Sequence, residues 1–155
     1  MGQVVKINEL LDIIKELKSE NKVVVTTNGC FDILHVGHVR YLNQAKALGD
    51  ILVVCLNTDK SVKKLKGDSR PINSENDRAE VLAGLSSVDY VILFDEETPS
   101  DLLGKIKPDI HVKGGDYNVD TLPESKVIQQ AGGKIIFLPF VEGKSTTGII
   151  NKINS

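Results

Sequence analysis

Two histidines close together in the sequence have the residue types and spacing for phosphate chemistry. His35 and His38 stand three residues apart in the stretch His35-Val36-Gly37-His38, a spacing that puts both side chains on one face of the first turn of a helix. Imidazole can donate a hydrogen bond to a phosphate oxygen as a neutral ring or as a cation. Gly37 removes a Cβ at a point where a phosphate would approach the backbone. The pattern predicts an anion-binding site.

A strand and a helix must position this turn. The β-branched run at 23–27 predicts a buried strand that ends at Asn28-Gly29, and apolar residues at helical spacing follow from Leu42 onward. A helix that begins at the histidines would direct its free N–H groups and the positive end of its dipole into the same space. The anion site therefore has two sources of hydrogen-bond donors.

Two other interpretations of the histidines are possible. Both could be ordinary residues of an exposed helix start, although a pair flanking a glycine after a strand disfavours this. Cys30, His35 and His38 could instead be zinc ligands. Structural zinc sites usually have four ligands, and no second cluster of Cys or His in the sequence completes the set.

The rest of the chain alternates strands and helices. Further apolar runs predict strands, and amphipathic stretches predict helices, one of which begins at a Ser74/Asp77 capping box. The expected strands are 23–27, 51–56, 90–94, 110–113 and 135–138, and the expected helices include 7–19, 99–107 and 124–131. This order predicts a three-layer α/β sandwich with a Rossmann-like parallel sheet of about five strands. We expect a single domain over 1–155, with the helix in residues 1–20 packed on it.

Composition limits the possible functions. The chain has 155 residues, 41% hydrophobic residues and a formal net charge of −2, which favours one well-filled core and disfavours broad electrostatic binding to nucleic acid. Neither a signal-peptide pattern nor an apolar run of about 18 residues is present, so no membrane association is expected. Two cysteines, Cys30 and Cys55, suggest reduced thiols in a cytoplasmic protein. The Gly-x-Gly-x-x-Gly and Walker patterns are absent, which argues against an NAD enzyme or a P-loop NTPase.

Polar residues gather where the expected parallel strands end, and this edge is where ligands bind in open α/β sheets. Each group follows a strand or begins a helix. The candidates are Asn57, the basic loop 62–72 with Lys66 and Arg70, the segment Lys113-Gly114-Gly115-Asp116-Tyr117, and Ser145-Thr146-Thr147 at the start of a C-terminal helix. We expect the basic loop to reach phosphates and the hydroxyl cluster to form a second anion-binding helix N-terminus.

The motifs also carry a family resemblance. The stretch Gly29-Cys30-Phe31-Asp32-x2-His35-x-Gly37-His38 resembles the signature of the HxGH nucleotidyltransferases, which join a nucleoside monophosphate to a phosphorylated substrate and release pyrophosphate. Downstream matches extend over nearly the whole chain: Leu65-Lys66-Gly67, Arg70-Pro71-Ile72, Asp77-Arg78-Ala79, Val112-Lys113-Gly114-Gly115-Asp116-Tyr117 and Gly143-x-Ser145-Thr146-Thr147. Together they look like the heptose 1-phosphate adenylyltransferases, which act in making the activated heptose of bacterial lipopolysaccharide inner core.

The resemblance implies roles for individual residues. His35 and His38 would bind the triphosphate of ATP, and Lys66 would neutralise charge near the α-phosphate or the sugar phosphate. The other implied nucleotide contacts are Cys30, Phe31, Asp32, Gly37, Arg78, Lys113, Gly114, Ser145, Thr146 and Thr147, with Arg78 on the β and γ phosphates; the implied acceptor contacts are Asp32, Asn57, Lys66, Arg70 and Asp116. Mg²⁺ would bridge phosphates, with no carboxylate cage of its own.

Several alternatives remain at this stage. A cytidylyltransferase that acts on glycerol 3-phosphate or a similar acceptor shares the histidine signature, and a non-catalytic nucleotide-binding module could share the fold. The family domain is often fused behind a sugar kinase, so the chain is either a stand-alone enzyme or one domain of such a fusion. We expect small-molecule substrates and a homodimer or higher homo-oligomer.

Overall fold

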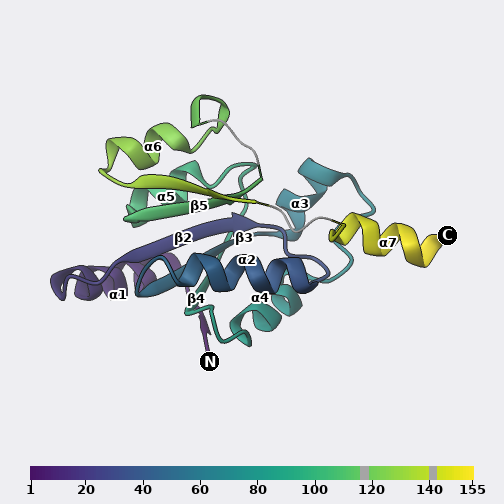
Figure 1. Cartoon of the computed structure of the whole chain (residues 1–155), viewed down its shortest axis with the longest axis horizontal. Coiled ribbons are helices and arrows are strands. Elements are labelled where there is room, and N and C mark those ends of the chain that lie inside the picture. The colour runs from purple at the N-terminus through teal and green to yellow at the C-terminus, as the bar shows by residue number, and fades with distance from the viewer. Residues whose placement is uncertain (116–118, 140–142) are drawn as a thin grey trace.

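The computed structural model describes residues 1–115, 119–139 and 143–155 and contains one parallel sheet (Figure 1). Six strands lie in the order β1-β4-β3-β2-β5-β6. Their bounds are β1 Gln3–Val4, β2 Val24–Gly29, β3 Ile51–Asn57, β4 Tyr90–Phe94, β5 Ile110–Gly114 and β6 Lys134–Leu138. The predicted α/β class with a parallel sheet is confirmed.

Helices cover both faces of the sheet, which gives three layers (Figure 1). Their bounds are α1 Ile7–Ser19, α2 Val36–Lys46, α3 Asp59–Lys66, α4 Glu75–Ala83, α5 Ser100–Ile106, α6 Ser125–Gln130 and α7 Thr146–Asn154, with a short 3₁₀ turn at Val119–Thr121. Helices α2 and α4 pack on one face, and α1, α5 and α6 pack on the other. None of these helices is both long and apolar enough to cross a membrane.

The core follows the two-residue period of the strands. Val24 and Val53 point to the α1/α5 face, whereas Val25 and Val54 point to the α2/α4 face, and all four are fully buried. Successive side chains of a strand point to opposite faces, so a continuous apolar run serves two cores at once. This explains why the central strands were predictable from sequence.

Two elements differ from the sequence-based expectations. β1 adds a sixth strand beside β4, and its two residues are too short to show a period. The segment 62–72, expected to be a loop, begins within helix α3, which continues to Lys66. Thr58 caps that helix, because its side chain accepts from the Ser61 N–H, and Val62 is its one fully buried apolar side chain. Such a short apolar pattern gives little helical signal.

The strand order reverses direction between β2 and β5. From β2 the chain proceeds to β3 and β4 on one side, and then returns to add β5 and β6 on the other. Adjacent strands whose connections leave in opposite directions open a crevice at their carboxyl ends, and this is the usual ligand site in open α/β sheets. The histidine turn follows β2 directly and therefore lies at this crevice.

Candidate functional site

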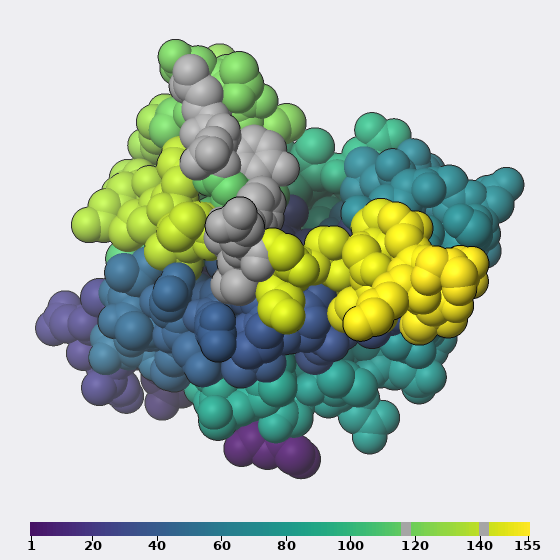
Figure 2. Space-filling model, turned by 45° about the vertical axis from the view of Figure 1, so that its right-hand side comes forward, coloured from purple at the N-terminus to yellow at the C-terminus, as the bar shows by residue number. Residues whose placement is uncertain are grey.

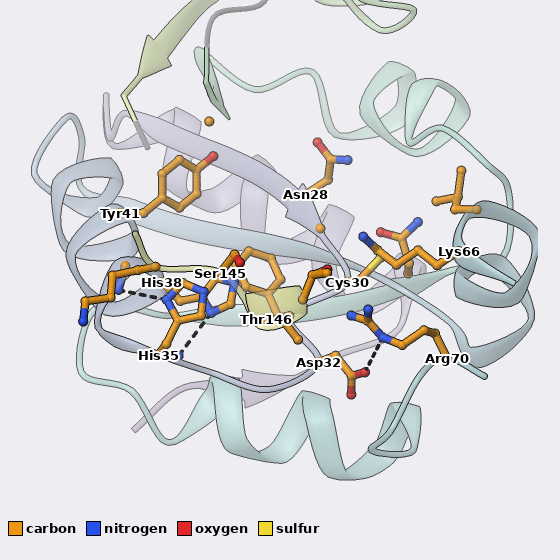
Figure 3. Close-up of a pocket in the computed structure, with 18 of the residues that line it drawn as sticks. Asn28, Cys30, Asp32, His35, His38, Tyr41, Lys66, Arg70, Ser145 and Thr146 are labelled. Atoms are coloured by element: carbon orange, nitrogen blue, oxygen red, sulfur yellow. Dashed lines mark hydrogen bonds and ion pairs between the residues drawn. The ribbon is translucent and has the colours of Figure 1, made fainter. Parts of the chain in front are cut away.

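A cleft of about 930 Å³ opens at the carboxyl ends of β2, β3 and β5. Figure 3 shows the histidines and the pair Lys66 and Arg70 at opposite sides of it, with Asn28 and Cys30 between them. The described residues that line the cleft are Asn28, Gly29, Cys30, Phe31, Asp32, His35, Gly37, His38, Tyr41, Asn57, Leu65, Lys66, Arg70, Glu97, Lys113, Gly114, Pro139, Gly143, Lys144, Ser145, Thr146 and Thr147.

The two histidines cap helix α2 with their own side chains. The Gly37 N–H donates to Nδ1 of His35 at 3.1 Å, and the His35 N–H donates to Nδ1 of His38 at 3.3 Å. A backbone N–H can only donate, so each Nδ1 must present a lone pair, and in a neutral ring the proton is then on Nε2. The helix start therefore fixes the tautomer of both rings and leaves each Nε2–H available as a donor.

Both rings are neutral at physiological pH. They lie against each other with ring centroids 3.9 Å apart and ring planes tilted by 31°. Burial, with a smaller contribution from the charge of His35, lowers the pKa of His38 to about 4. Burial and the nearby Lys144 ammonium lower the pKa of His35 as well. The pair is thus a preformed set of neutral donors rather than a fixed positive charge.

Gly37 is required for a reason that the sequence did not indicate. A Cβ at this position would lie 2.8 Å from Cε1 and 2.9 Å from Nδ1 of the His35 ring. Carbon atoms in contact normally stay about 3.5 Å apart. The glycine therefore makes room for the imidazole of His35 to fold back over the helix start.

Asp32 organises the loop that carries Arg70. Its buried carboxylate accepts from Nε of Arg70 at 3.2 Å and from the backbone N–H groups of Ile72 and Asn73 at 2.7 and 2.8 Å. These three donors engage both carboxylate oxygens. Asp32 therefore lines the cleft, as expected, but its carboxylate holds Arg70 in place more than it faces the cleft.

Arg78, for which the resemblance implied contact with the β and γ phosphates, is not among the described residues that line the cleft. Its guanidinium is 1% exposed and donates to three backbone carbonyls and to Asp59 Oδ1, all at 2.8 to 3.0 Å. The carbonyls belong to Cys30, Asn57 and Asn73. Arg78 therefore ties the ends of β2 and β3 to the loop before α4, beneath the site.

The cations Lys66 and Arg70 line the side of the cleft away from the histidines (Figure 3). Lys66 is the last residue of α3 and precedes Gly67, whose φ of 93° ends the helix. Residues other than glycine rarely adopt that backbone conformation. Asn57 also lines the cleft, but it is 2% exposed and its amide donates to the Ser61 hydroxyl.

Helix α7 contributes its N-terminus to the cleft. The Ser145 hydroxyl accepts from the Gly148 N–H at 2.9 Å and so caps the helix. Thr146 donates to the carbonyl of Ile33 at 2.9 Å, which ties α7 to the loop before the histidines. The predicted second anion-binding helix start thus lies beside the first, and Lys144 adds a cation there.

Most predicted site residues share this one cleft. Arg78 lies outside it, and Asp116 lies outside the described residues. Sequence reasoning missed Asn28, Tyr41, Glu97 and Lys144, which all line the cleft. Asn28 and Lys144 adjoin predicted motifs, so their positions offered a signal. Tyr41 of α2 offered none, because its place depends on a hydroxyl that donates to the Val112 carbonyl of β5, which is distant in the sequence.

Cys30 and Cys55 are free thiols, as expected. Burial raises the pKa of Cys55 to about 12. Burial also raises the pKa of Cys30, although the surrounding Lys66, Arg78 and Arg70 charges oppose the effect. Both thiols are therefore protonated at neutral pH. Within the described ranges, no group of three or more His, Cys, Asp or Glu side chains is placed to hold a metal ion.

Fold and site together define a Rossmann-like domain with a cleft lined by imidazole, ammonium and guanidinium groups at its topological switch point. Residues 26–151 match the family described as Cytidylyltransferase-like, and this range contains the histidine turn, the four cationic residues that line the cleft and the start of α7. The chain therefore belongs to the cytidylyltransferase-like family. The resemblance found from the motifs is confirmed at that level.

Known proteins resemble nearly the whole chain. The bifunctional protein HldE of Campylobacter concisus is 56% identical over 95% of this chain, and that of Pseudomonas fluorescens is 52% identical over 98%. These matches cover 30% and 32% of the relatives, so the chain spans about a third of their length. A crystal structure of the lipopolysaccharide core biosynthesis protein from Thermoplasma volcanium has a TM-score of 0.63 and 32% identity, covering 79% of this chain and 99% of that one.

Proposed function

We propose that this domain is an adenylyltransferase that transfers AMP from ATP to heptose 1-phosphate and so produces ADP-heptose and pyrophosphate. The observation that carries the proposal is the pair of fixed Nε2–H donors of His35 and His38 beside the N-terminus of α7. Two helix starts and two imidazoles at one cleft suit a triphosphate better than a single phosphate.

The proposed reaction needs no general base. A phosphate oxygen of the acceptor forms a bond to the α-phosphorus of ATP, while the bond from that phosphorus to the oxygen bridging to the β-phosphate breaks. Pyrophosphate leaves with the electron pair. Nucleophile and leaving group are both ionised already, so catalysis comes from alignment and from donors directed at the charge that develops.

Each part of the cleft suits one part of this chemistry. His35 and His38 would donate to the α- and β-phosphate oxygens in the transition state, and the α7 start with Lys144 would hold the leaving pyrophosphate. Lys66 and Arg70, on the other side, would bind the acceptor phosphate. Of the described lining residues only Asp32 and Glu97 are carboxylates, and Asp32 is engaged by Arg70 and the loop. Mg²⁺ would therefore arrive with ATP, bound mainly to its phosphates.

The identity of the acceptor rests on the motifs and the relatives. The segment Lys113-Gly114-Gly115 and the other downstream motifs resemble the heptose 1-phosphate adenylyltransferases. A similar solved protein is titled as a lipopolysaccharide core biosynthesis protein, and ADP-heptose would be a precursor for that core. Use of ATP together with two free thiols fits a cytoplasmic location.

The decisive experiment supplies Mg²⁺ and heptose 1-phosphate with either ATP or CTP, measures pyrophosphate release and identifies the sugar nucleotide. ADP-heptose from ATP alone is the expected result. CTP turnover with glycerol 3-phosphate would assign a cytidylyltransferase instead. Nucleotide binding without pyrophosphate from any acceptor would leave a binding module.

A further inference from the structure

A polar network lies behind the cleft, between β5 and α6. His111 of β5 is fully buried, and Glu124, next to α6, is 2% exposed. Neither Nε2 of His111 nor Oε1 of Glu124 has a hydrogen-bond partner among the described residues. Buried polar atoms nearly always have partners, so this pair calls for an explanation.

The Glu124 carboxylate lies between two nitrogen donors. Its Oε1 is 3.8 Å from Nε2 of His111 and 3.6 Å from Nζ of Lys113. Both distances exceed hydrogen-bond length, but the shorter one, from the carboxylate to the Lys113 ammonium, still allows a charge interaction at low dielectric. The Lys113 ammonium also donates to Oδ1 of Asn28 at 3.2 Å. Lys113 and Asn28 both line the cleft, so the buried carboxylate lies directly behind a residue of the site, Lys113.

The charges in this network are fixed by their surroundings. Burial alone would raise the pKa of Glu124, but the His111 ring and the Lys113 charge outweigh it and hold the pKa below its usual value. Burial keeps the pKa of His111 low, so the ring is neutral. One buried anion therefore faces one cation, and a buried charge is tolerated only when it is paired.

We propose that Glu124 is a positioning residue that holds the Lys113 ammonium at the end of β5, where Lys113 contacts the bound nucleotide. The proposal rests on the proposed function, because it takes the ligand at Lys113 to be the nucleotide. Without the carboxylate, the ammonium at the end of a four-carbon side chain would lose the buried anion beside it and would be held less firmly at the Asn28 side of the cleft.

His111 supports the carboxylate from the far side. Nδ1 of His111 lies 2.8 Å from the Thr26 hydroxyl. When that hydroxyl donates, the ring proton lies on Nε2 and points toward Glu124. Thr26 belongs to β2 and His111 to β5, which pair directly. The two strands that form the switch point therefore fix the carboxylate, and the carboxylate in turn fixes the lysine.

The test is a double-mutant cycle on nucleotide affinity. ATP and CTP dissociation constants are measured by calorimetry for the wild type, Glu124→Gln, Lys113→Met and the double variant. We expect Glu124→Gln to weaken ATP binding about tenfold, the scale of one hydrogen bond to a charged group. It should have no further effect when Lys113 is already Met. In turnover, KM for ATP should rise by about the same factor, with kcat changed less.

A stability measurement separates positioning from folding. Lys113→Met leaves the buried carboxylate without its cation, so adding Glu124→Gln should restore part of the lost unfolding temperature. Asp89→Asn is the matched control, because Asp89 pairs with Lys46 at 2.5 Å and is not among the lining residues. It should lower stability and leave ATP affinity unchanged. If Glu124→Gln does not fold, Glu124→Asp keeps the charge but moves it away from Lys113, and a smaller weakening of ATP binding is expected, which again disappears beside Lys113→Met.

The outcomes are distinct. Glu124→Gln with wild-type ATP affinity and a lower unfolding temperature would make Glu124 merely structural and overturn the proposal. If Glu124→Gln weakens ATP binding by the same factor in the Lys113→Met background as in the wild type, the proposal is overturned as well. If the wild type binds ATP but forms no ADP-heptose, the cycle still decides this proposal and only the proposed reaction fails. A wild type that binds neither ATP nor CTP would overturn both.

Discussion

Two neighbouring parts of the cleft, the histidine turn after β2 and the start of α7, are built differently. The first, the histidine side, is fixed by hydrogen bonds within its own helix start and rests on a framework in which the buried Asp32 and Arg78 hold the loop at 70–73. The second, the α7 side, has no buried residue in its helix and extends away from the sheet (Figure 1). In the space-filling view it lies on the outside of the molecule (Figure 2). Its tie to the histidine side is the Thr146 bond to Ile33.

This difference matches the two tasks of a nucleotidyl transfer. Donors that stabilise the transition state must be in place before the reaction, because moving them would cost part of the gain. The group that holds pyrophosphate must also release it in every cycle, and release often limits turnover. We therefore assign catalysis to the histidine side and adjustable leaving-group binding to α7.

The largest expected effect is at His38. His38→Ala removes one fixed donor and should lower kcat about a hundredfold or more, the scale for one preorganised transition-state donor. Steady-state pyrophosphate release measures it. Turnover close to wild type would remove His38 from the mechanism. It would also show that the histidine side contributes no more to catalysis than the α7 side.

Two amide variants separate the two functions of this ring. Asn can accept from the His35 N–H near the position of Nδ1, and Gln can donate near the position of Nε2. If the donor matters, His38→Gln should retain more activity than His38→Asn. The reverse order would show that the helix cap is the main contribution of His38.

The framework beneath the histidine side should respond in stability. Arg78→Met leaves three carbonyls and the Asp59 carboxylate without their donor and should lower the free energy of unfolding by about 2 kcal/mol or more. Arg70→Met, in the cleft, should cost less stability and mainly raise the KM for the acceptor. Urea unfolding and kinetics on both variants test this contrast. An Arg78→Met protein of wild-type stability with weakened ATP binding would restore the phosphate-binding role predicted from sequence.

The histidine side was largely predictable because its residues are close in sequence. A strand, a turn and a helix start are local features, so the spacing of His35, Gly37 and His38 was enough to place them. The same holds for the Ser145 cap of α7, whose acceptor and donor are three residues apart. Both helix starts at the cleft are therefore predictable from the sequence.

Arg78 and Glu124 show what sequence could not supply. Arg78 is a charged residue in the first turns of a helix, a pattern typical of a surface or a ligand contact, yet its partners lie 5 to 48 residues away in the chain. Glu124 likewise precedes α6, whereas its neighbours His111 and Lys113 belong to β5. Whether a charged side chain is buried depends on which distant segments pack over it, and the local sequence pattern does not contain that information.

A smaller effect is expected on the α7 side. Thr146→Val keeps the side-chain shape but removes the hydroxyl that donates to Ile33. The loss of one neutral hydrogen bond amounts to about 1 kcal/mol, which would raise KM for ATP several-fold while kcat changes little. Ser155→Ala is the control, because its hydroxyl donates to Lys152 at the far end of the same helix. A hundredfold loss of kcat in Thr146→Val would show that α7 is as fixed as the histidines.

The smallest expected effect is the pH dependence of stability that comes from the histidine side. The folded state holds the pKa of His38 at about 4, below the ordinary 6.5, so between these values the unfolded chain binds more protons than the folded one. The free energy of unfolding must then fall as pH falls from 6.5 toward 4. Because solvent screens the partly exposed ring, we expect a fall on the order of 1 kcal/mol at pH 5. Urea midpoints at pH 8 and pH 5 should drop further for the wild type than for His38→Gln, which lacks the titrating ring but shares every carboxylate. Equal drops would show that the ring is protonated in the folded state and would remove the basis for treating the pair as neutral donors.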